Sequence, residues 1–187
     1  MRLRIVAGDL GGRYIEAPAG RHTRPTAARV REAWFSALAD DVVDARVADL
    51  YAGSGALGIE ALSRGAAHVH FVESDRRVAS VLDRNLRSLG LGSRSRLVRG
   101  DALAWIDGLA EPLDLVLADP PYGSAGGARL VERFRLRPFA AQLWLEHGSD
   151  AGLTEMADWT REYGDTRVSR FRPLAGLPLS TPKRNVG

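Results

Sequence analysis

The sequence has no cysteine, almost no lysine and no long apolar run. Without cysteine, its 187 residues cannot form disulfides or thiolate metal sites. Lys183 is the only lysine among 26 basic residues, so arginine carries nearly all of the positive charge. No window is long and apolar enough to cross a membrane, and residues 1–6 lack the apolar core of a signal peptide. We therefore expect a cytoplasmic protein that does not bind a membrane.

Histidine is also scarce, with 4 residues in the whole chain. His68 and His70 have the spacing that puts both rings on one face of a strand. No third ligand lies near them in the sequence, whereas a structural zinc site needs about four. We expect this pair to pack or to face solvent, and we expect no bound metal.

The positive charge is unevenly distributed along the chain. The formal net charge is only +3, but residues 1–31 contain seven arginines and only two acids, Asp9 and Glu16. A preference for arginine codons explains the missing lysines, but it does not explain the shortage of acids in this segment. Guanidinium groups bind phosphates and stack on bases. The N-terminal segment therefore predicts contact with a phosphate-rich partner.

The chain is long enough for one domain with a substantial core and a small extension. Strand patterns at 2–7 and 13–17 flank a glycine-rich turn and predict an N-terminal hairpin. An amphipathic helix follows, with Thr26 as its expected N-cap and an apolar stripe over residues 30–38.

From Arg46 onward, apolar strand patterns alternate with helical patterns. This alternation predicts an open α/β sheet with helices on both faces. Gly164-Asp165 lies between two strand patterns and predicts a hairpin, and hence an antiparallel excursion at one edge of the sheet. The expected strands are 47–51, 68–72, 96–98, 113–118, 142–146, 161–163 and 166–171, and the expected helices are 56–64, 75–89, 102–109, 129–135 and 154–159.

Three glycines lie where the first of these strands turns into a helix. Gly53, Gly55 and Gly58 fit the pattern G-x-G-x-x-G, which permits a tight turn and close approach of a cofactor to the backbone. Glu73 ends the next strand, where a carboxylate can accept hydrogen bonds from ribose hydroxyls. Taken alone, these features fit a dinucleotide as well as an adenosyl amino acid.

Two further strand-end acids favour the adenosyl amino acid. Asp49 would put a negative charge beside the cofactor, which repels a pyrophosphate and complements an ammonium or a sulfonium. Asp101 follows the third strand, where it can accept a hydrogen bond from an adenine amine. It can also cap the next helix, and the two roles are compatible.

A compact motif, Asp119-Pro120-Pro121-Tyr122, follows the apolar strand pattern at 113–118 and precedes a flexible stretch at 123–127. Prolines after a strand often only end it. Here they would rigidly hold a carboxylate, a carbonyl and an aromatic ring next to one another. Such a set suits a planar ring with an exocyclic amine.

This motif resembles the Asp/Asn-Pro-Pro-Tyr/Phe motif of the S-adenosylmethionine-dependent methyltransferases that modify exocyclic amines. Over about residues 2–172 the chain is also similar to the RsmD family of bacterial 16S rRNA guanine-N2 methyltransferases. The resemblance implies a Rossmann-like class I methyltransferase fold with a mostly parallel seven-stranded sheet. It also implies S-adenosylmethionine as cofactor and methylation of the guanine conventionally numbered 966, within an assembled or partly assembled 30S particle. The similar stretches are Arg4–Gly8, Arg24–Thr26, Arg29–Glu32, Asp49–Ala66 and Tyr163–Thr166.

The resemblance and the chemistry of the residues together assign the expected site. The Asp119 carboxylate and the Pro120 carbonyl would accept hydrogen bonds from the guanine amine, and Tyr122 would stack on the base. The expected catalytic residues are Asp119, Pro120, Pro121 and Tyr122; the cofactor-binding residues are Thr26, Asp49, Tyr51, Gly53, Ser54, Gly55, Glu73, Ser74, Asp101, Ala102 and Asp119; the RNA-binding residues are Arg2, Arg4, Arg13, Arg24, Arg29 and Arg31. The expected parts are 1–40, a basic hairpin and helix that would bind RNA and cover the cofactor; 41–172, the methyltransferase domain; and 173–187, a tail.

Three alternatives stay open from the sequence. A DNA or protein N-methyltransferase could have the same motif, although glutamine enzymes favour asparagine where Asp119 stands. DNA enzymes usually carry a target-recognition segment, for which 187 residues leave little room. A nicotinamide oxidoreductase has no use for Asp-Pro-Pro-Tyr. A non-catalytic RNA-binding assembly factor could retain a vestigial pocket. The sequence shows no interface signal, and we expect a monomer.

Overall fold

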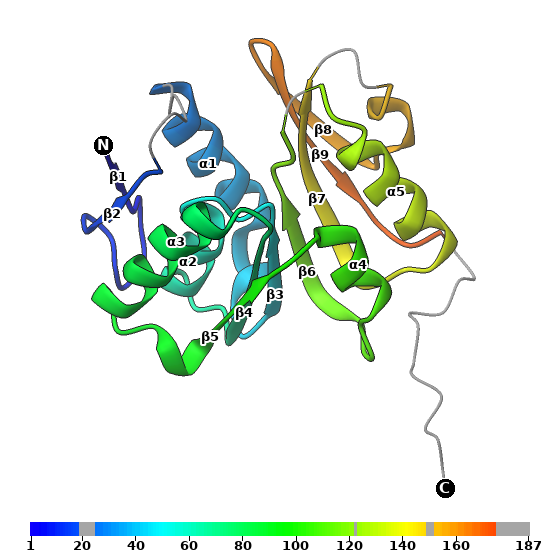
Figure 1. Ribbon diagram of the computed structural model, residues 1–187. Helices are drawn as coiled ribbons and strands as arrows, with labels where there is room; N and C mark the ends of the chain where they lie inside the picture. Colours follow the sequence, from blue (N-terminus) through cyan, green and yellow to red (C-terminus); the bar gives the residue numbers. More distant parts are fainter. Residues whose placement is uncertain (19–24, 122, 149–151, 175–187) are drawn as a thin grey trace, which may run out of the picture.

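The computed structural model describes residues 1–18, 25–121, 123–148 and 152–174 (Figure 1). Within them, a small antiparallel sheet lies beside a seven-stranded sheet of order β5-β4-β3-β6-β7-β9-β8. The small sheet consists of β1 (Arg2–Arg4) and β2 (Tyr14–Glu16). The large sheet consists of β3 (Arg46–Leu50), β4 (His68–Glu73), β5 (Ser95–Arg99), β6 (Leu113–Ala118), β7 (Ala140–Gly148), β8 (Trp159–Tyr163) and β9 (Thr166–Phe171).

The large sheet is mostly parallel, as predicted. Strands β3 to β7 pair in parallel, whereas β9 is antiparallel to both β7 and β8. The tight turn between β8 and β9 includes Gly164 in a left-handed conformation (φ +63°), which glycine adopts at little cost. The hairpin therefore places β9 beside β7 and leaves β8 at the edge.

Alternating side chains on the central strands supply two separate cores. Val47 and Leu115 face one core, and their neighbours Ala48 and Val116 face the other. Because both faces are buried, β6 reads as an almost continuous apolar run. Figure 1 shows α1 (Pro25–Leu38), α2 (Ala56–Ser63) and α3 (Arg76–Ser88) on one face, and α4 (Ala102–Asp107) and α5 (Gly126–Leu136) on the other.

Buried polar side chains of α2 and α3 attach the N-terminal hairpin to this domain. The Glu60 carboxylate accepts hydrogen bonds from the backbone N–H groups of Val6 (2.8 Å) and Ala7 (3.0 Å). The Asn85 amide accepts from the Glu16 N–H (2.8 Å) and donates to the Glu16 carbonyl (2.9 Å). A two-stranded hairpin is marginal alone, so these contacts to the helices hold it in place.

Gly8 is expected to be the least replaceable residue of the hairpin turn. Its φ is +80°, and a Cβ there would lie 1.9 Å from the Ser63 carbonyl oxygen. Gly8→Ala should lower the free energy of unfolding by about 2–4 kcal/mol, since the clash adds to the left-handed strain. Gly90→Ala is the matched control because Gly90 has φ +70° and nothing within 4 Å of the new Cβ. Urea unfolding measures both, and equal losses would contradict the predicted backbone clash.

Two local predictions are wrong. Thr26 is the second residue of α1, not its N-cap, because the helix begins at Pro25, whose fixed φ suits the first helical position. The helix expected at 154–159 is only a short 3-10 turn, Thr154–Met156, and Trp159 already belongs to β8. The Trp159 ring packs 5.2 Å from the Trp144 ring, and this tertiary contact favours the strand.

Two other expectations concern membrane-spanning helices and the C-terminal tail. In the part of the chain that the structure describes, no helix has the length and apolarity needed to cross a membrane. Of the expected tail at 173–187, the structure describes Pro173 and Leu174, and the rest lies outside the described residues. The remaining 3-10 turns are Ala39–Val42 and Gly92–Arg94.

Candidate active site

The carboxyl ends of β3, β4 and β6 meet at one edge of the large sheet. After β3 the chain continues to β4, which pairs with β3 on one side. Strand β6 pairs with β3 on its other side, so the strand order reverses at β3. Open α/β sheets bind ligands in the crevice outside such a reversal. Asp49, Glu73 and Asp119 all lie at this edge. The register pairs Leu50 of β3 with Ala118 of β6, which directly precedes Asp119.

The turn from β3 into α2 has a left-handed backbone at three positions. The φ angles are +59° at Tyr51, +59° at Gly53 and +83° at Gly55. The glycines adopt this conformation readily, whereas the tyrosine pays about 1–2 kcal/mol. The third glycine serves packing instead, because a Cβ on Gly58 would lie 2.3 Å from the Phe71 ring. The G-x-G-x-x-G pattern thus forms a tight turn and a close helix–strand contact.

Asp49 and Glu73 are buried and bind the backbone of this turn. The Asp49 carboxylate accepts a hydrogen bond from the Gly58 N–H (2.8 Å). The Glu73 carboxylate accepts from the N–H groups of Gly53 (2.9 Å) and Asp75 (2.9 Å). Across residues 1–18, 25–121, 123–148 and 152–174, neither acid forms an ion pair. When ionised, buried carboxylates of this kind complement a cationic or hydroxyl-bearing ligand and disfavour a pyrophosphate.

The protonation of Asp49 depends on what lies beside it. Burial raises the pKa of Asp49 well above its ordinary value; the hydrogen bond from Gly58 opposes this shift, and the charges of Asp119 and Glu73 add to it. A positive group next to Asp49 would favour its charged form. Binding of a cationic ligand beside Asp49 would therefore be coupled to the ionisation of this carboxyl.

Asp49→Asn is expected to raise the Tm of the protein without ligand, and by more at about pH 8 than at about pH 5. A carboxyl whose pKa is raised by folding contributes stability that is present at low pH. That contribution is lost as the pH rises through the folded pKa. Asparagine keeps an oxygen for the Gly58 N–H but does not titrate, so the variant keeps its stability. Thermal unfolding of both proteins across this pH range measures the difference in Tm, and a difference that shrinks with pH would contradict the prediction.

The Asp-Pro-Pro segment leaves β6 beside this turn. Asp119 is half-buried, Pro120 is buried and Pro121 is exposed. The Ser124 hydroxyl (2.6 Å) and N–H (3.2 Å) both donate to the Pro121 carbonyl and close a turn. No group in the described part of the chain donates to the Pro120 carbonyl, which therefore retains its acceptor capacity. Tyr122 lies outside the described residues, and its stacking role stays a prediction.

Tyr51 directly follows β3, and Asp101 lies just after β5. Burial raises the pKa of the half-buried Tyr51, and the negative charge of Asp101 raises it further. Asp101 is exposed and caps α4 by accepting from the Ala104 N–H (2.8 Å), which is the second of its two expected roles. Of the other expected cofactor contacts, Ser74 is exposed and Ala102 is buried.

Arg31 differs from the other arginines of the N-terminal segment. It is buried, and its guanidinium donates to the Arg4 carbonyl (2.7 Å) and lies 3.8 Å from the Glu60 carboxylate. Burial lowers the pKa of Arg31, and Glu60 partly offsets this. Arg31 therefore joins α1 to the hairpin inside the protein.

The remaining arginines of that segment lie at the surface where the structure describes them. Arg2, Arg4 and Arg29 are exposed, and the exposed Arg13 donates to the Ser88 carbonyl (3.3 Å). Arg24 and the side chain of Thr26 lie outside the described residues, so their expected roles stay predictions.

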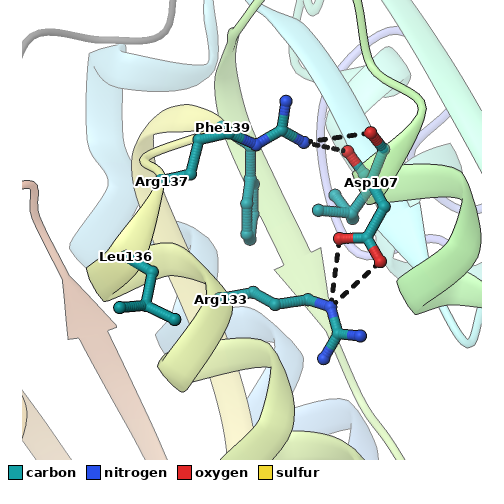
Figure 2. Close-up of a pocket in the computed structure, with 6 residues that line it drawn as sticks. Asp107, Arg133, Leu136, Arg137 and Phe139 are labelled. Carbon is teal, nitrogen blue, oxygen red and sulfur yellow. Dashed lines mark hydrogen bonds and ion pairs between the residues drawn. The ribbon is translucent and has the colours of Figure 1, made fainter.

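A separate pocket lies at the opposite edge of the sheet (Figure 2). It lies between the last turns of α4 and α5, next to Phe139 at the start of β7. Its polar groups bind one another: Arg133 donates to the Asp107 carboxylate (3.0 and 3.2 Å), and Arg137 donates to the Ile106 and Asp107 carbonyls. This pocket is remote from the strand-end acids, Arg133 is paired with Asp107, and Arg137 is hydrogen-bonded to backbone carbonyls.

The sequence analysis missed the residues that fix the hairpin. Asn85 also donates to the carbonyl of Ser54 in the glycine turn (3.0 Å), so one side chain links the hairpin to the crevice. A polar residue between Leu82 and Leu86 on the apolar face of α3 was the available signal. Glu60, an acid in the otherwise apolar α2, gave a similar signal.

Comparisons with known proteins show which family this chain belongs to. The Ribosomal RNA small subunit methyltransferase D of Escherichia coli strain K12 is 42% identical over 121 residues, which are 65% of this chain and 61% of that protein. The protein of the same name in Haemophilus influenzae is 34% identical over 167 residues, 84% of this chain and 85% of that protein. A solved Escherichia coli structure, "Putative methyltransferase yhhF", superimposes with a TM-score of 0.81 at 30% identity and covers 92% of this chain and 98% of that chain.

The match to the Escherichia coli methyltransferase thus spans about three fifths of that protein's length, 61%. The family model described as Conserved hypothetical protein 95 covers nearly the whole described chain, residues 3–169. The chain therefore belongs to the Conserved hypothetical protein 95 family, which is the RsmD family.

Proposed function

We propose that this protein transfers a methyl group from S-adenosylmethionine to the exocyclic N2 amine of a guanine in 16S rRNA. The observation that carries the proposal is the convergence of Asp49, Glu73 and Asp119 at the reversal point of the sheet, beside the left-handed glycine turn. The names of the relatives in the same family support the RNA substrate. The protein would act as a cytoplasmic monomer on a 30S particle or an assembly intermediate.

The residues of the crevice fit this cofactor. The glycine turn would let a ligand approach the backbone closely, Glu73 would offer acceptors to ribose hydroxyls, and Asp101 would offer one to an adenine amine. Asp49 would complement the positive charge of the amino acid part. Bound S-adenosylmethionine supplies an electrophilic methyl group on its sulfonium. The other cofactor contacts in the proposal are Thr26, Tyr51, Gly53, Ser54, Gly55, Ser74, Ala102 and Asp119.

The Asp-Pro-Pro-Tyr segment would hold the acceptor amine. The lone pair of the guanine N2 is delocalised into the ring, so this nitrogen is a weak nucleophile. Asp119 and the Pro120 carbonyl would each accept a hydrogen bond from one N–H of this amine. These two hydrogen bonds would direct its lone pair toward the methyl group of the cofactor. Asp119 then accepts a proton, which the nitrogen releases easily once it carries the methyl group. Tyr122 would stack on the base and fix its plane.

The base must leave its stack to reach Asp119, so the RNA has to be gripped nearby. We assign this grip to the basic part at residues 1–40, with exposed Arg2, Arg4, Arg13 and Arg29, and the reaction to residues 41–172. Arg31 is the exception in that segment, because its guanidinium is already bound inside the protein.

The proposal is tested by offering methyl-labelled S-adenosylmethionine with four acceptors: 30S particles, naked 16S rRNA, DNA and ribosomal protein. We expect label in the RNA of one or both ribosomal substrates and none in DNA or protein. Calorimetry should show binding of S-adenosylmethionine and no binding of NAD. Binding of RNA without any methyl transfer would instead indicate an assembly factor, and label in DNA or protein would identify a different methyltransferase.

A further inference from the structure

Helix α3 presents a row of arginines to solvent on the side opposite its buried residues Leu82 and Leu86. With 3.6 residues per turn, the members of this row fall within about a third of the helix circumference. Their side chains are all exposed. This row, the α3 stripe, consists of Arg76, Arg77, Arg84 and Arg87.

The acids near the α3 stripe do not neutralise it. Arg84 lies 3.4 Å from Glu16, with both side chains 59% exposed, and Arg87 lies 3.0 Å from Asp83 and is 79% exposed. Exposed pairs of this kind contribute about 0–1 kcal/mol and exchange readily for other partners. The rest of the stripe, Arg76 and Arg77, has no ion-pair partner among the described residues. The stripe therefore carries positive charge that an anionic partner can neutralise.

The α3 stripe connects two regions that the proposed function already uses. It begins at Arg76, three positions after Glu73 in the candidate active site. Along its length it lies beside the basic hairpin, which Asn85 and the Arg13–Ser88 contact attach to α3 (Figure 1). The exposed arginines of α3 thus extend from the residue after Asp75, close to Glu73, to Arg84, which contacts Glu16 of β2.

We infer that the α3 stripe binds the phosphates of the RNA strand that delivers the target base. The inference rests on the proposed function. Guanidinium groups pair with phosphate oxygens through two parallel N–H groups. At 1.5 Å per residue the stripe extends over about 16 Å, which is long enough to follow several successive phosphates. An acidic protein has the same sign of charge as RNA, but the stripe's start close to Glu73 of the candidate active site favours the RNA backbone, which has to pass that site.

The test is a titration of naked 16S rRNA with the protein at several KCl concentrations. Each lost phosphate contact lowers the slope of log K against log salt by about 0.7–0.9. Removing three stripe arginines should therefore flatten the slope by about 2 and weaken binding by about 100-fold near 0.1 M salt. The control variant loses the same charge from exposed arginines elsewhere and should keep the slope. The stripe variant is Arg76→Gln/Arg77→Gln/Arg84→Gln, and the control is Arg46→Gln/Arg161→Gln/Arg172→Gln.

The same titration is carried out with polyglutamate, which stands for an acidic protein. Three results would overturn the inference: an unchanged slope in the stripe variant, equal flattening of the slope in both variants, or a stripe variant that binds polyglutamate more weakly but binds RNA as the wild type does. All the exchanged side chains are exposed, so both variants should unfold at the wild-type temperature. Methyl transfer by the wild type is measured separately. If it is absent while only the stripe variant loses RNA affinity, the proposed reaction is wrong and the RNA-binding surface stands.

Discussion

Asp119→Ala is expected to lower the rate of methyl transfer by about 10²–10⁴-fold while the protein still binds S-adenosylmethionine. Asp119 directly follows β6, whereas the acids that would hold the cofactor's ribose and charged end, Glu73 and Asp49, lie on β4 and β3. The substitution removes the acceptor that orients the amine and takes its proton. The loss should therefore appear in kcat, with a small effect on cofactor affinity.

Asp114→Ala is the matched control for this experiment. Asp114 is an exposed acid near the start of β6, at the opposite end of that strand from Asp119, where it accepts a hydrogen bond from the Arg46 N–H (2.7 Å). Single-turnover transfer and calorimetric cofactor binding should be measured for both variants. Near wild-type turnover in Asp119→Ala, or an equal loss in Asp114→Ala, would remove Asp119 from the reaction.

Glu60→Ala is expected to lower the free energy of unfolding by about 3–5 kcal/mol, the largest stability effect that we anticipate. Glu60 is buried, pairs with Arg64 (2.9 Å) and lies 3.8 Å from Arg31. It also accepts hydrogen bonds from the backbone N–H groups of Val6 and Ala7. Without it, the buried Arg31 loses its counter-charge and two backbone donors lose their acceptor.

Urea unfolding of two further variants separates these causes. Glu60→Gln keeps an acceptor for one backbone N–H but loses the charge, so its loss should fall between those of the wild type and Glu60→Ala. Glu111→Ala breaks an exposed pair with Arg46 (3.4 Å) and should cost less than about 1 kcal/mol. If Glu60→Ala unfolds with the same free energy as Glu111→Ala, the hairpin is not held by this carboxylate.

Much of the fold could be predicted because local patterns and global fold agree in the central sheet. The strand expected at 113–118 has the same bounds in the structure, since an apolar run followed by two prolines allows little else. The turn around Gly53 and Gly55 and the hairpin at Gly164 were also found, because a left-handed backbone strongly selects glycine.

The misses have a tertiary cause. Arg29 and Arg31 both lie off the apolar stripe of α1, and periodicity alone could not distinguish them. Only the folded chain shows that Arg31 is buried against Glu60 and the Arg4 carbonyl, while Arg29 faces solvent. Asn85 likewise looks like an interruption of an apolar face until the hairpin's backbone lies against it.

The most direct test of the proposed reaction is mass spectrometry of nucleosides from 16S rRNA after incubation with the protein and labelled S-adenosylmethionine. The acceptor geometry around Asp119 and Pro120, together with the family of the chain, predicts N2-methylguanosine at a single position of the RNA. The Asp119→Ala protein should produce none. Label in methyladenosine or methylcytidine, or no label in RNA that the protein binds, would contradict the proposed function.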